Sequence, residues 1–226
     1  MDFRALLYFA GILFINPTYV ANFMASSFSI TQDKILTTRQ WKLLSRELED
    51  ARSSAQLLNK KTTHVHDYYL INIGWMTGLR ISEVSRLNWG DIGDDEWLVV
   101  KDGKGSKDRT IFYGKRTQAL IDDYRKFKME VMGSGCRPSD PVFTNVHRKR
   151  YGPSGIHRRM KFWLDRVKLP NKLSYHSLRH GFATRMLNEG VNLHDLREML
   201  GHSSIAVTSI YLHFTEDSRE KFRKLL

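Results

Sequence analysis

The sequence predicts a mainly α-helical fold that carries a small antiparallel β-sheet. Apolar residues recur at helical spacing over most of the chain, and the runs 97–100 and 110–113 are rich in β-branched and aromatic residues. The chain has 226 residues, of which 41% are hydrophobic, and this is enough to bury one core. We therefore expect one main α+β domain with a short segment ahead of it.

Residues 1–35 form the segment ahead of the main domain. Residues 5–15 are an apolar run that is too short to span a bilayer, and residues 26–34 are mostly small and polar, like a linker. Asp2 and Arg4 leave no positively charged leader before the run. Two interpretations stay open: the run packs on the main domain, or it is the last helix of a preceding module.

The main domain is expected over residues 36–226 and begins with a capped helix. Thr37 and Gln40 have the spacing of a capping box, and Leu36 and Trp41 stand where a hydrophobic staple would place them. The apolar residues that follow continue one helical face.

Gly78 predicts the end of the second helix, because glycine readily takes the left-handed conformation that closes a helix. That helix is expected over 64–77, and the next from Ser82 to about Leu87. Further helices are expected at about 116–132, 153–167, 177–189, 193–200 and 204–211, with an amphipathic tail over 216–226.

A β-hairpin is predicted between these helices. The runs Trp97–Val100 and Thr110–Tyr113 flank a polar turn that contains glycines. The pair Val142 and Phe143 is a candidate third strand.

Positive charge is concentrated in the second half of the chain. The formal net charge is +12. Residues 1–100 carry 10 Lys and Arg against 11 Asp and Glu, a net of −1, whereas residues 101–226 carry 26 against 13, a net of +13. Such a field favours nucleic acid or an anionic membrane surface as the partner, although solubility alone also explains a basic composition.

Three motifs carry residues suited to phosphate chemistry. Towards the end of the chain, His176 and Arg179 are three residues apart, so a helix brings them to one face. His202 follows a glycine that can close a helix, and Tyr211 comes nine residues later.

The other two motifs lie upstream. Arg80 and Glu83 follow the glycine that ends the second predicted helix. Lys104 stands at the tip of the hairpin turn, whose glycines let the backbone approach a ligand closely.

In residue type, order and spacing, these motifs resemble the catalytic domain of the tyrosine recombinase, or phage integrase, family over residues 36–226. The family signature is an arginine, a lysine, His-x-x-Arg, a later histidine and a tyrosine. The resemblance implies the tyrosine recombinase catalytic-domain fold. The catalytic residues that it implies are Arg80, Lys104, His176, Arg179, His202 and Tyr211, with Glu83 in support and Lys107 as an alternative to Lys104.

The implied reaction is attack of the Tyr211 phenol on a DNA phosphodiester, which forms a 3′-phosphotyrosyl link without metal or ATP. A phenol with its ordinary pKa of about 10 is a weak nucleophile near neutrality, so it needs nearby cations and a proton acceptor. Arg80 and Arg179 suit the non-bridging oxygens, and the family assigns the acid for the leaving 5′-oxygen to Lys104. The first signature histidine is implied to move the tyrosine proton, and the second to donate a hydrogen bond to the phosphate.

Further basic residues in the second half are candidate DNA contacts. They are Lys107, Arg109, Arg148, Lys149, Arg150, Arg158 and Arg159. A solvated surface is the other interpretation. His176 and His180 have the spacing of zinc ligands, but no third ligand is evident, so neither a metal nor a cofactor is expected.

The leading hypothesis is a site-specific recombinase that cleaves and rejoins double-stranded DNA. A type IB topoisomerase-like enzyme and a DNA-binding regulator that has lost catalysis are the alternatives. The family implies a homo-oligomer, a tetramer on DNA, assembled in part through the tail 213–226. Most members carry a larger core-binding domain where this chain has residues 1–35, which are a candidate remnant of it, so an accessory protein is a further candidate partner.

The cysteine content points to a compartment. Cys136 is the only cysteine and forms no internal disulfide, so a reducing compartment fits. We expect a cytoplasmic, nucleoid-associated protein with no membrane partner.

Overall fold

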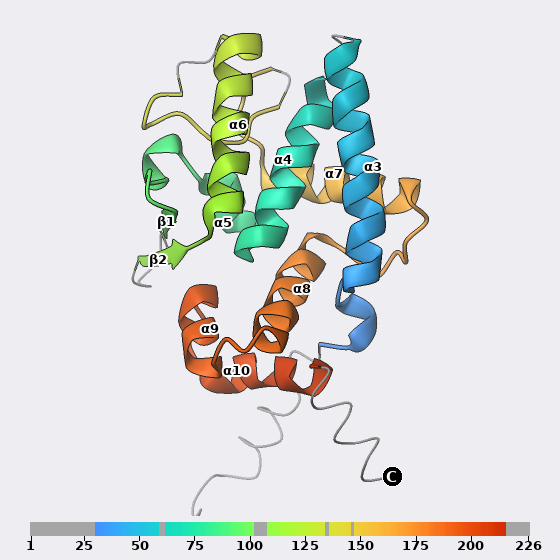
Figure 1. Ribbon diagram of the computed structural model, residues 1–226, viewed down its shortest axis with the longest axis vertical. Coiled ribbons are helices and arrows are strands. Elements are labelled where there is room, and N and C mark those ends of the chain that lie inside the picture. Colours follow the sequence, from blue (N-terminus) through green and yellow to red (C-terminus); the bar gives the residue numbers. More distant parts are fainter. Residues whose placement is uncertain (1–29, 59–61, 102–107, 134–135, 146, 216–226) are drawn as a thin grey trace, which may run out of the picture. The chain divides into compact units, whose positions relative to one another are not determined.

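Helix α4 (Thr62–Thr77) is the centre of the fold, because its residues are apolar on nearly all sides. The computed structural model describes residues 30–58, 62–101, 108–133, 136–145 and 147–215. In it, α4 packs against α3 (Thr38–Leu57), α6 (Lys115–Met132), α7 (Pro153–Arg166) and α8 (Tyr175–Asn188). Figure 1 shows α3 and α4 side by side, with α8 gathered below them with α9 and α10.

The start of α3 confirms the predicted capping box. The Thr37 side chain accepts from the Gln40 backbone N–H at 3.3 Å, and the Gln40 side chain accepts from the Thr37 backbone N–H at 2.9 Å. Trp41 then stacks on Trp75 of α4, with ring centroids 4.5 Å apart. The capped end of α3 is thereby joined to the central helix.

The predicted glycine stop after α4 is also confirmed. Gly78 has a φ of +65°, in the left-handed region. Helix α4 begins at Thr62, slightly earlier than predicted, and α5 (Ile81–Arg86) follows the glycine turn. This turn places Arg80 immediately before α5.

The predicted hairpin is present as β1 (Trp97–Val100) and β2 (Arg109–Phe112), which pair antiparallel with Val100 opposite Arg109. The predicted third strand is wrong. Val142 and Phe143 are buried, but the neighbouring bridges of Pro141 and Thr144 go to two different segments, so no continuous ladder forms there.

The end of the described chain is helical but divided. Helix α9 (Leu193–Leu200) is followed by α10 (Ile205–Ser209) and a 3₁₀ helix, η3 (Ile210–Phe214), where one continuous helix over 204–211 was predicted. Tightening of a final turn into 3₁₀ geometry is common at helix ends. Two further 3₁₀ turns are η1 (Gln32–Lys34) and η2 (Trp89–Asp91).

Contacts between residues place a division of the chain between Thr31 and Gln32. The predicted boundary at residue 35 lies slightly later. Most of the predicted N-terminal segment, the hairpin turn with Lys104 and Lys107, and the predicted tail helix over 216–226 lie outside the described residues. Within the ranges that are described, no helix is both long enough and apolar enough to cross a membrane.

Candidate active site

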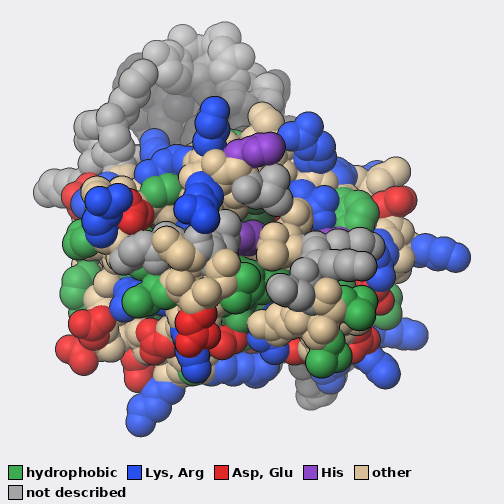
Figure 2. Space-filling model, turned by 90° about the horizontal axis from the view of Figure 1, so that it is seen from above, with side chains coloured by type: hydrophobic (Ala, Val, Ile, Leu, Met, Phe, Trp, Pro, Cys, Tyr) green, Lys and Arg blue, Asp and Glu red, His purple; other side chains and the backbone are tan. Residues whose placement is uncertain are grey.

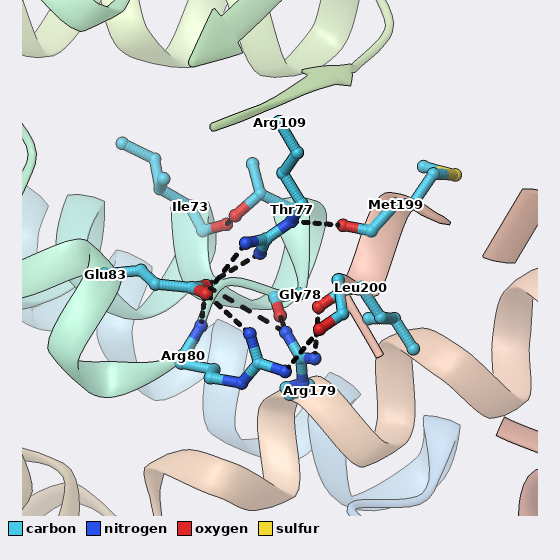
Figure 3. A network of polar contacts seen from close by, with 10 residues as sticks. Ile73, Thr77, Gly78, Arg80, Glu83, Arg109, Arg179, Met199 and Leu200 are labelled. Carbon is cyan, nitrogen blue, oxygen red and sulfur yellow. Dashed lines mark hydrogen bonds and ion pairs between the residues drawn. The ribbon is translucent and has the colours of Figure 1, made fainter. Parts of the chain in front are cut away.

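One carboxylate, that of Glu83 on α5, gathers arginines from three elements (Figure 3). Arg109 of β2 donates from its two Nη atoms to the two oxygens of Glu83, at 3.0 and 2.9 Å. Arg80 donates to the same carboxylate from its backbone N–H at 2.7 Å and from Nη1 at 2.8 Å. Nη1 of Arg179, on α8, lies 4.0 Å from Glu83 Oε2. We call these four residues the arginine cluster.

Glu83 remains ionised although it is buried. Burial alone would raise the pKa of its carboxyl group, but the hydrogen bonds and charge of Arg109, together with the backbone N–H of Arg80, lower it to about 2. The cluster therefore holds three positive charges around one negative charge, and the excess positive charge suits an anionic ligand.

Backbone carbonyls at two glycine turns fix the guanidiniums of Arg80 and Arg179. Arg179 donates to the carbonyls of Gly78 at 2.9 Å and Leu200 at 2.5 Å, and Arg80 donates to that of Gly201 at 2.9 Å. Gly78 and Gly201 have φ angles of +65° and +64°, which glycine adopts without strain. The Arg179 side chain is 5% exposed and the Arg80 side chain is 32% exposed, so Arg80 is the more accessible of these two arginines.

The Tyr211 ring lies next to the arginine cluster and is 1% exposed. Its hydroxyl is 2.8 Å from Nδ1 of His180, and its ring stacks on that of His202 with centroids 6.4 Å apart. Burial raises the pKa of Tyr211 to about 12, although the charges of Arg179 and Arg80 act to lower it. The phenol is therefore neutral and lies within the field of both arginines.

His202 is positioned by the glycine that ends α9. It follows Gly201 directly, and its Nδ1 is 2.8 Å from the Thr208 hydroxyl. Burial, followed by the charges of Arg179 and Arg80, lowers the pKa of His202 to about 3. We call His180, His202, Thr208 and Tyr211 the tyrosine pocket.

The other two histidines near the cluster are also uncharged. Burial, followed by the charges of His176 and Arg179, lowers the pKa of His180 to about 4. His176, on the same helix, is accessible but partly desolvated, and this partial desolvation, followed by the charges of Arg179 and Arg80, lowers its pKa. At neutral pH these imidazoles are therefore neutral.

Comparison with known proteins identifies this arrangement. Residues 44–218 match the model of the phage integrase family. The chain belongs to this family. Residues that the integrase resemblance singled out from far apart in the sequence, namely Arg80, His176, Arg179, His202 and Tyr211, come together in space, whereas Lys104 lies outside the described residues.

Several integrase-family relatives are tyrosine recombinases. Tyrosine recombinase XerC of Pediococcus pentosaceus is 34% identical over 157 residues, which cover 69% of this chain and 52% of that protein. Tyrosine recombinase XerD of Chlamydia muridarum is 34% identical over 181 residues, covering 80% of this chain and 57% of that protein. The chain thus spans about half the length of these relatives.

Solved integrase-family structures share the fold. XerA recombinase superposes with a TM-score of 0.66 at 23% identity, covering 88% of this chain and 64% of that one. The catalytic domain of bacteriophage HP1 integrase gives a TM-score of 0.56 at 22% identity, covering 84% and 93%. The predicted fold class, mainly α-helical with a small antiparallel sheet, is confirmed.

Some basic residues that were predicted to contact DNA are engaged inside the protein instead. Arg159 forms an ion pair at 2.5 Å with Asp67, which is fully buried and also accepts from the Trp163 indole at 2.9 Å. Arg150 donates to the Ser85 carbonyl at 3.0 Å. Together with the contacts of Arg109 to Glu83, these bonds give all three arginines partners within the protein.

The remaining candidates are accessible. Arg148, Lys149 and Arg158 are exposed, and Lys107 lies outside the described residues. Figure 2 shows Lys and Arg side chains at many points of the face in view rather than in one patch. The exposed three therefore remain candidates for contacts with a phosphate backbone.

His180 is the residue that the sequence interpretation missed. Its position four residues after His176 places both imidazoles on one face of α8, and in the sequence this spacing also fits a pair of zinc ligands. The same spacing brings His180 to the Tyr211 hydroxyl. The signal in the sequence was a second histidine one helical turn after the first signature histidine, which indicates a second imidazole on the same face of the helix.

Proposed function

We propose that this chain is the catalytic part of a site-specific DNA recombinase that cleaves and rejoins duplex DNA through Tyr211. The observation that carries the proposal is the position of the phenol, beside two neutral imidazoles and within the field of Arg179 and Arg80. Guanidinium groups match the geometry of phosphate oxygens, so this site suits a phosphodiester. Membership of the integrase family supports the same reaction.

In the proposed reaction, the Tyr211 oxygen bonds to phosphorus while the bond from phosphorus to the sugar 5′-oxygen breaks. Arg80 and Arg179 stabilise the charge that develops on the non-bridging oxygens. Lys104 gives a proton to the leaving 5′-oxygen. The product is a 3′-phosphotyrosyl link with a free 5′-hydroxyl, and attack by another 5′-hydroxyl reverses the steps and rejoins the strands.

The Tyr211 hydroxyl bonds to His180 in this structure, and in the proposed reaction this bond orients the phenol beside the arginine cluster. His176 is the proposed acceptor of the phenolic proton, since it is accessible, uncharged and near Arg80 and Arg179. His202 is the proposed hydrogen-bond donor to the phosphate. Its bond to Thr208 orients the ring for that contact.

The same proposal extends to the assembly. Double-stranded DNA is the partner, as relatives include XerH recombinase bound to its difH substrate and Tn1549 integrase in complex with transposon DNA. The chain acts as a homo-tetramer on DNA, with residues 213–226 reaching a neighbouring copy. An accessory protein is a further proposed partner. The site of action is the nucleoid in the cytoplasm.

Trapping the covalent intermediate tests the reaction. The substrate is a pool of duplexes with randomised sequence, each nicked close to a candidate cleavage position. Cleavage there releases a short fragment with a 5′-hydroxyl. Because the fragment dissociates and cannot rejoin, the phosphotyrosyl adduct accumulates. We expect a denaturation-resistant protein–DNA band, carrying a 3′-phosphate link, from the parent chain and none from Tyr211→Phe.

Two controls make this test decisive. Tyr211→Phe must still shift the same DNA in a native gel, which separates loss of chemistry from loss of binding. An adduct of equal yield in Tyr211→Phe, or DNA binding by the parent without any adduct, contradicts the proposal. Relaxation of supercoiled plasmid of any sequence without strand exchange would instead identify a topoisomerase-like enzyme.

A further inference from the structure

Arg109 occupies the point where the hairpin meets the catalytic residues. It is the first residue of β2, paired with Val100 of β1, and the turn that carries Lys104 ends just before it. Its side chain is 13% exposed and points into the arginine cluster, not to solvent (Figure 3). Arg109 is thus placed to contact the catalytic residues from inside the protein.

Three contacts connect Arg109 to two other elements of the site. Its two Nη atoms hold both oxygens of Glu83, in the bidentate geometry that fixes a carboxylate in one orientation. Its Nε donates to the carbonyl of Met199 at 3.1 Å, in the last turn of α9. One guanidinium therefore joins the hairpin, the start of α5 and the end of α9.

The contact with α9 continues into the turn that presents His202. A Cβ atom on Gly201 would lie only 2.9 Å from the Arg109 guanidinium, so the side chain fills the space that this glycine leaves open. Gly201 also has the left-handed φ that ends α9, and its carbonyl accepts from Arg80. Arg109 and Arg80 thus both contact the same turn.

We infer that Arg109 is a positioning residue for strand transfer: it orients Glu83 to hold Arg80 and braces the glycine turn that presents His202. This inference rests on the proposed function. It assigns to a residue of the basic hairpin a role other than contact with DNA. The role is to keep the hairpin, the phosphate-binding arginine and the second signature histidine in one fixed arrangement.

The charge state of Glu83 gives the inference a specific signature. Glu83 is faced by Arg80 from the turn before α5, Arg109 from β2, and Arg179 and the buried Tyr175 from α8. Other charged groups line the cavity that borders Glu83: Arg86, Asp91, Lys101 and Asp108. Arg109 contributes the largest lowering of the Glu83 pKa, and without it burial, which raises that pKa, is less opposed.

The test compares Arg109→Met and Arg109→Lys with the matched control Arg52→Met. Arg52 also pairs with carboxylates, those of Glu49 and Asp123, but on α3 and α6 away from the site. Rates of adduct formation are measured on the nicked duplexes with DNA saturated by protein, at about pH 8 and about pH 6.

We expect Arg109→Met to bind DNA like the parent but to form adduct at least about tenfold more slowly at the higher pH, the effect of losing hydrogen bonds to a charged group. Its rate falls further at the lower pH, because a Glu83 carboxyl with a raised pKa becomes protonated and releases Arg80. Arg109→Lys keeps the positive charge, so its rate should not fall further at the lower pH. It should still form adduct more slowly than the parent, because lysine lacks the bidentate contact. Arg52→Met follows the parent at both pH values.

A readout without DNA separates this inference from the proposed function. The Glu83 carboxyl is titrated by NMR in the parent and in Arg109→Met, and we expect its midpoint to move upward in the variant. If the parent forms no adduct, the proposed function fails, and this titration alone judges the link between Arg109 and Glu83. An unmoved midpoint, or an Arg109→Met variant with the parent rate at both pH values, overturns the inference.

Discussion

Two neighbouring regions of the site differ in the way they are held together. In the arginine cluster, three guanidiniums meet one ionised carboxylate, and every contact involves a full charge. In the tyrosine pocket, two imidazoles, a hydroxyl and a phenol are neutral and meet through single hydrogen bonds and stacked rings.

The difference teaches how such a site is prepared for an anion before it binds. Charged groups that already hold one another need little rearrangement when a phosphate arrives, which is the condition for strong electrostatic stabilisation. A buried neutral phenol, by contrast, keeps its proton until the reaction removes it. In the proposed reaction the arginine cluster stabilises the developing charge and the tyrosine pocket holds the nucleophile, so the two should respond differently to substitution.

The largest effect is expected from Arg179→Ala, which removes a buried donor from the cluster. Adduct formation should fall about a hundredfold or more, the usual cost of losing one preorganised donor. The measurement is the single-turnover rate of adduct formation at saturating protein. Arg185→Ala is the control, because Arg185 lies on the same helix but stacks over Trp75. A fall of less than about threefold would show that Arg179 is not part of the phosphate site.

Arg159→Met tests whether a similar ion pair outside the cluster serves the fold instead. Asp67 is fully buried and would lose its cationic partner, so the free energy of unfolding should fall by about 3 kcal/mol. Urea denaturation measures this change. The matched control Arg166→Met breaks the more exposed pair with Glu47 and should cost about 1 kcal/mol or less. Equal losses in the two variants would contradict the distinction.

A smaller effect is expected in the tyrosine pocket, from His180→Ala. Loss of one hydrogen bond to Tyr211 should slow adduct formation by about fivefold, since such a bond contributes about 1 kcal/mol. His180→Gln retains a hydrogen-bonding group and should recover part of the rate. A His180→Ala variant that reacts faster than the parent would mean that His180 restrains the nucleophile rather than orienting it.

The smallest effect is expected from the exposed surface. Arg158→Ala should weaken DNA binding by a similar factor on all sequences and should reduce the slope of log K against log salt by about one. Titrations at several salt concentrations measure this slope. The control Arg39→Ala, an exposed arginine at the start of α3, should leave it unchanged. An unchanged slope in Arg158→Ala would remove Arg158 from the phosphate contacts.

The amino-acid sequence by itself determined the elements with local signals. The capping pair Thr37 and Gln40, the stops at Gly78 and Gly201, and the β-rich runs of the hairpin act over a few residues, so they can be read without the fold. The signature residues were also visible, because their order and spacing identify the family. The third strand at Val142 and Phe143 failed because strand pairing depends on a partner that the segment itself does not specify.

The tertiary structure alone decided which charges meet. Arg109 and Arg159 looked like members of a basic surface, but their carboxylate partners lie 26 and 92 residues away along the chain. His180 became the neighbour of Tyr211 only when α8 and η3 packed together. Contacts of this kind depend on the packing of distant elements, and neither composition nor helical periodicity carries that information.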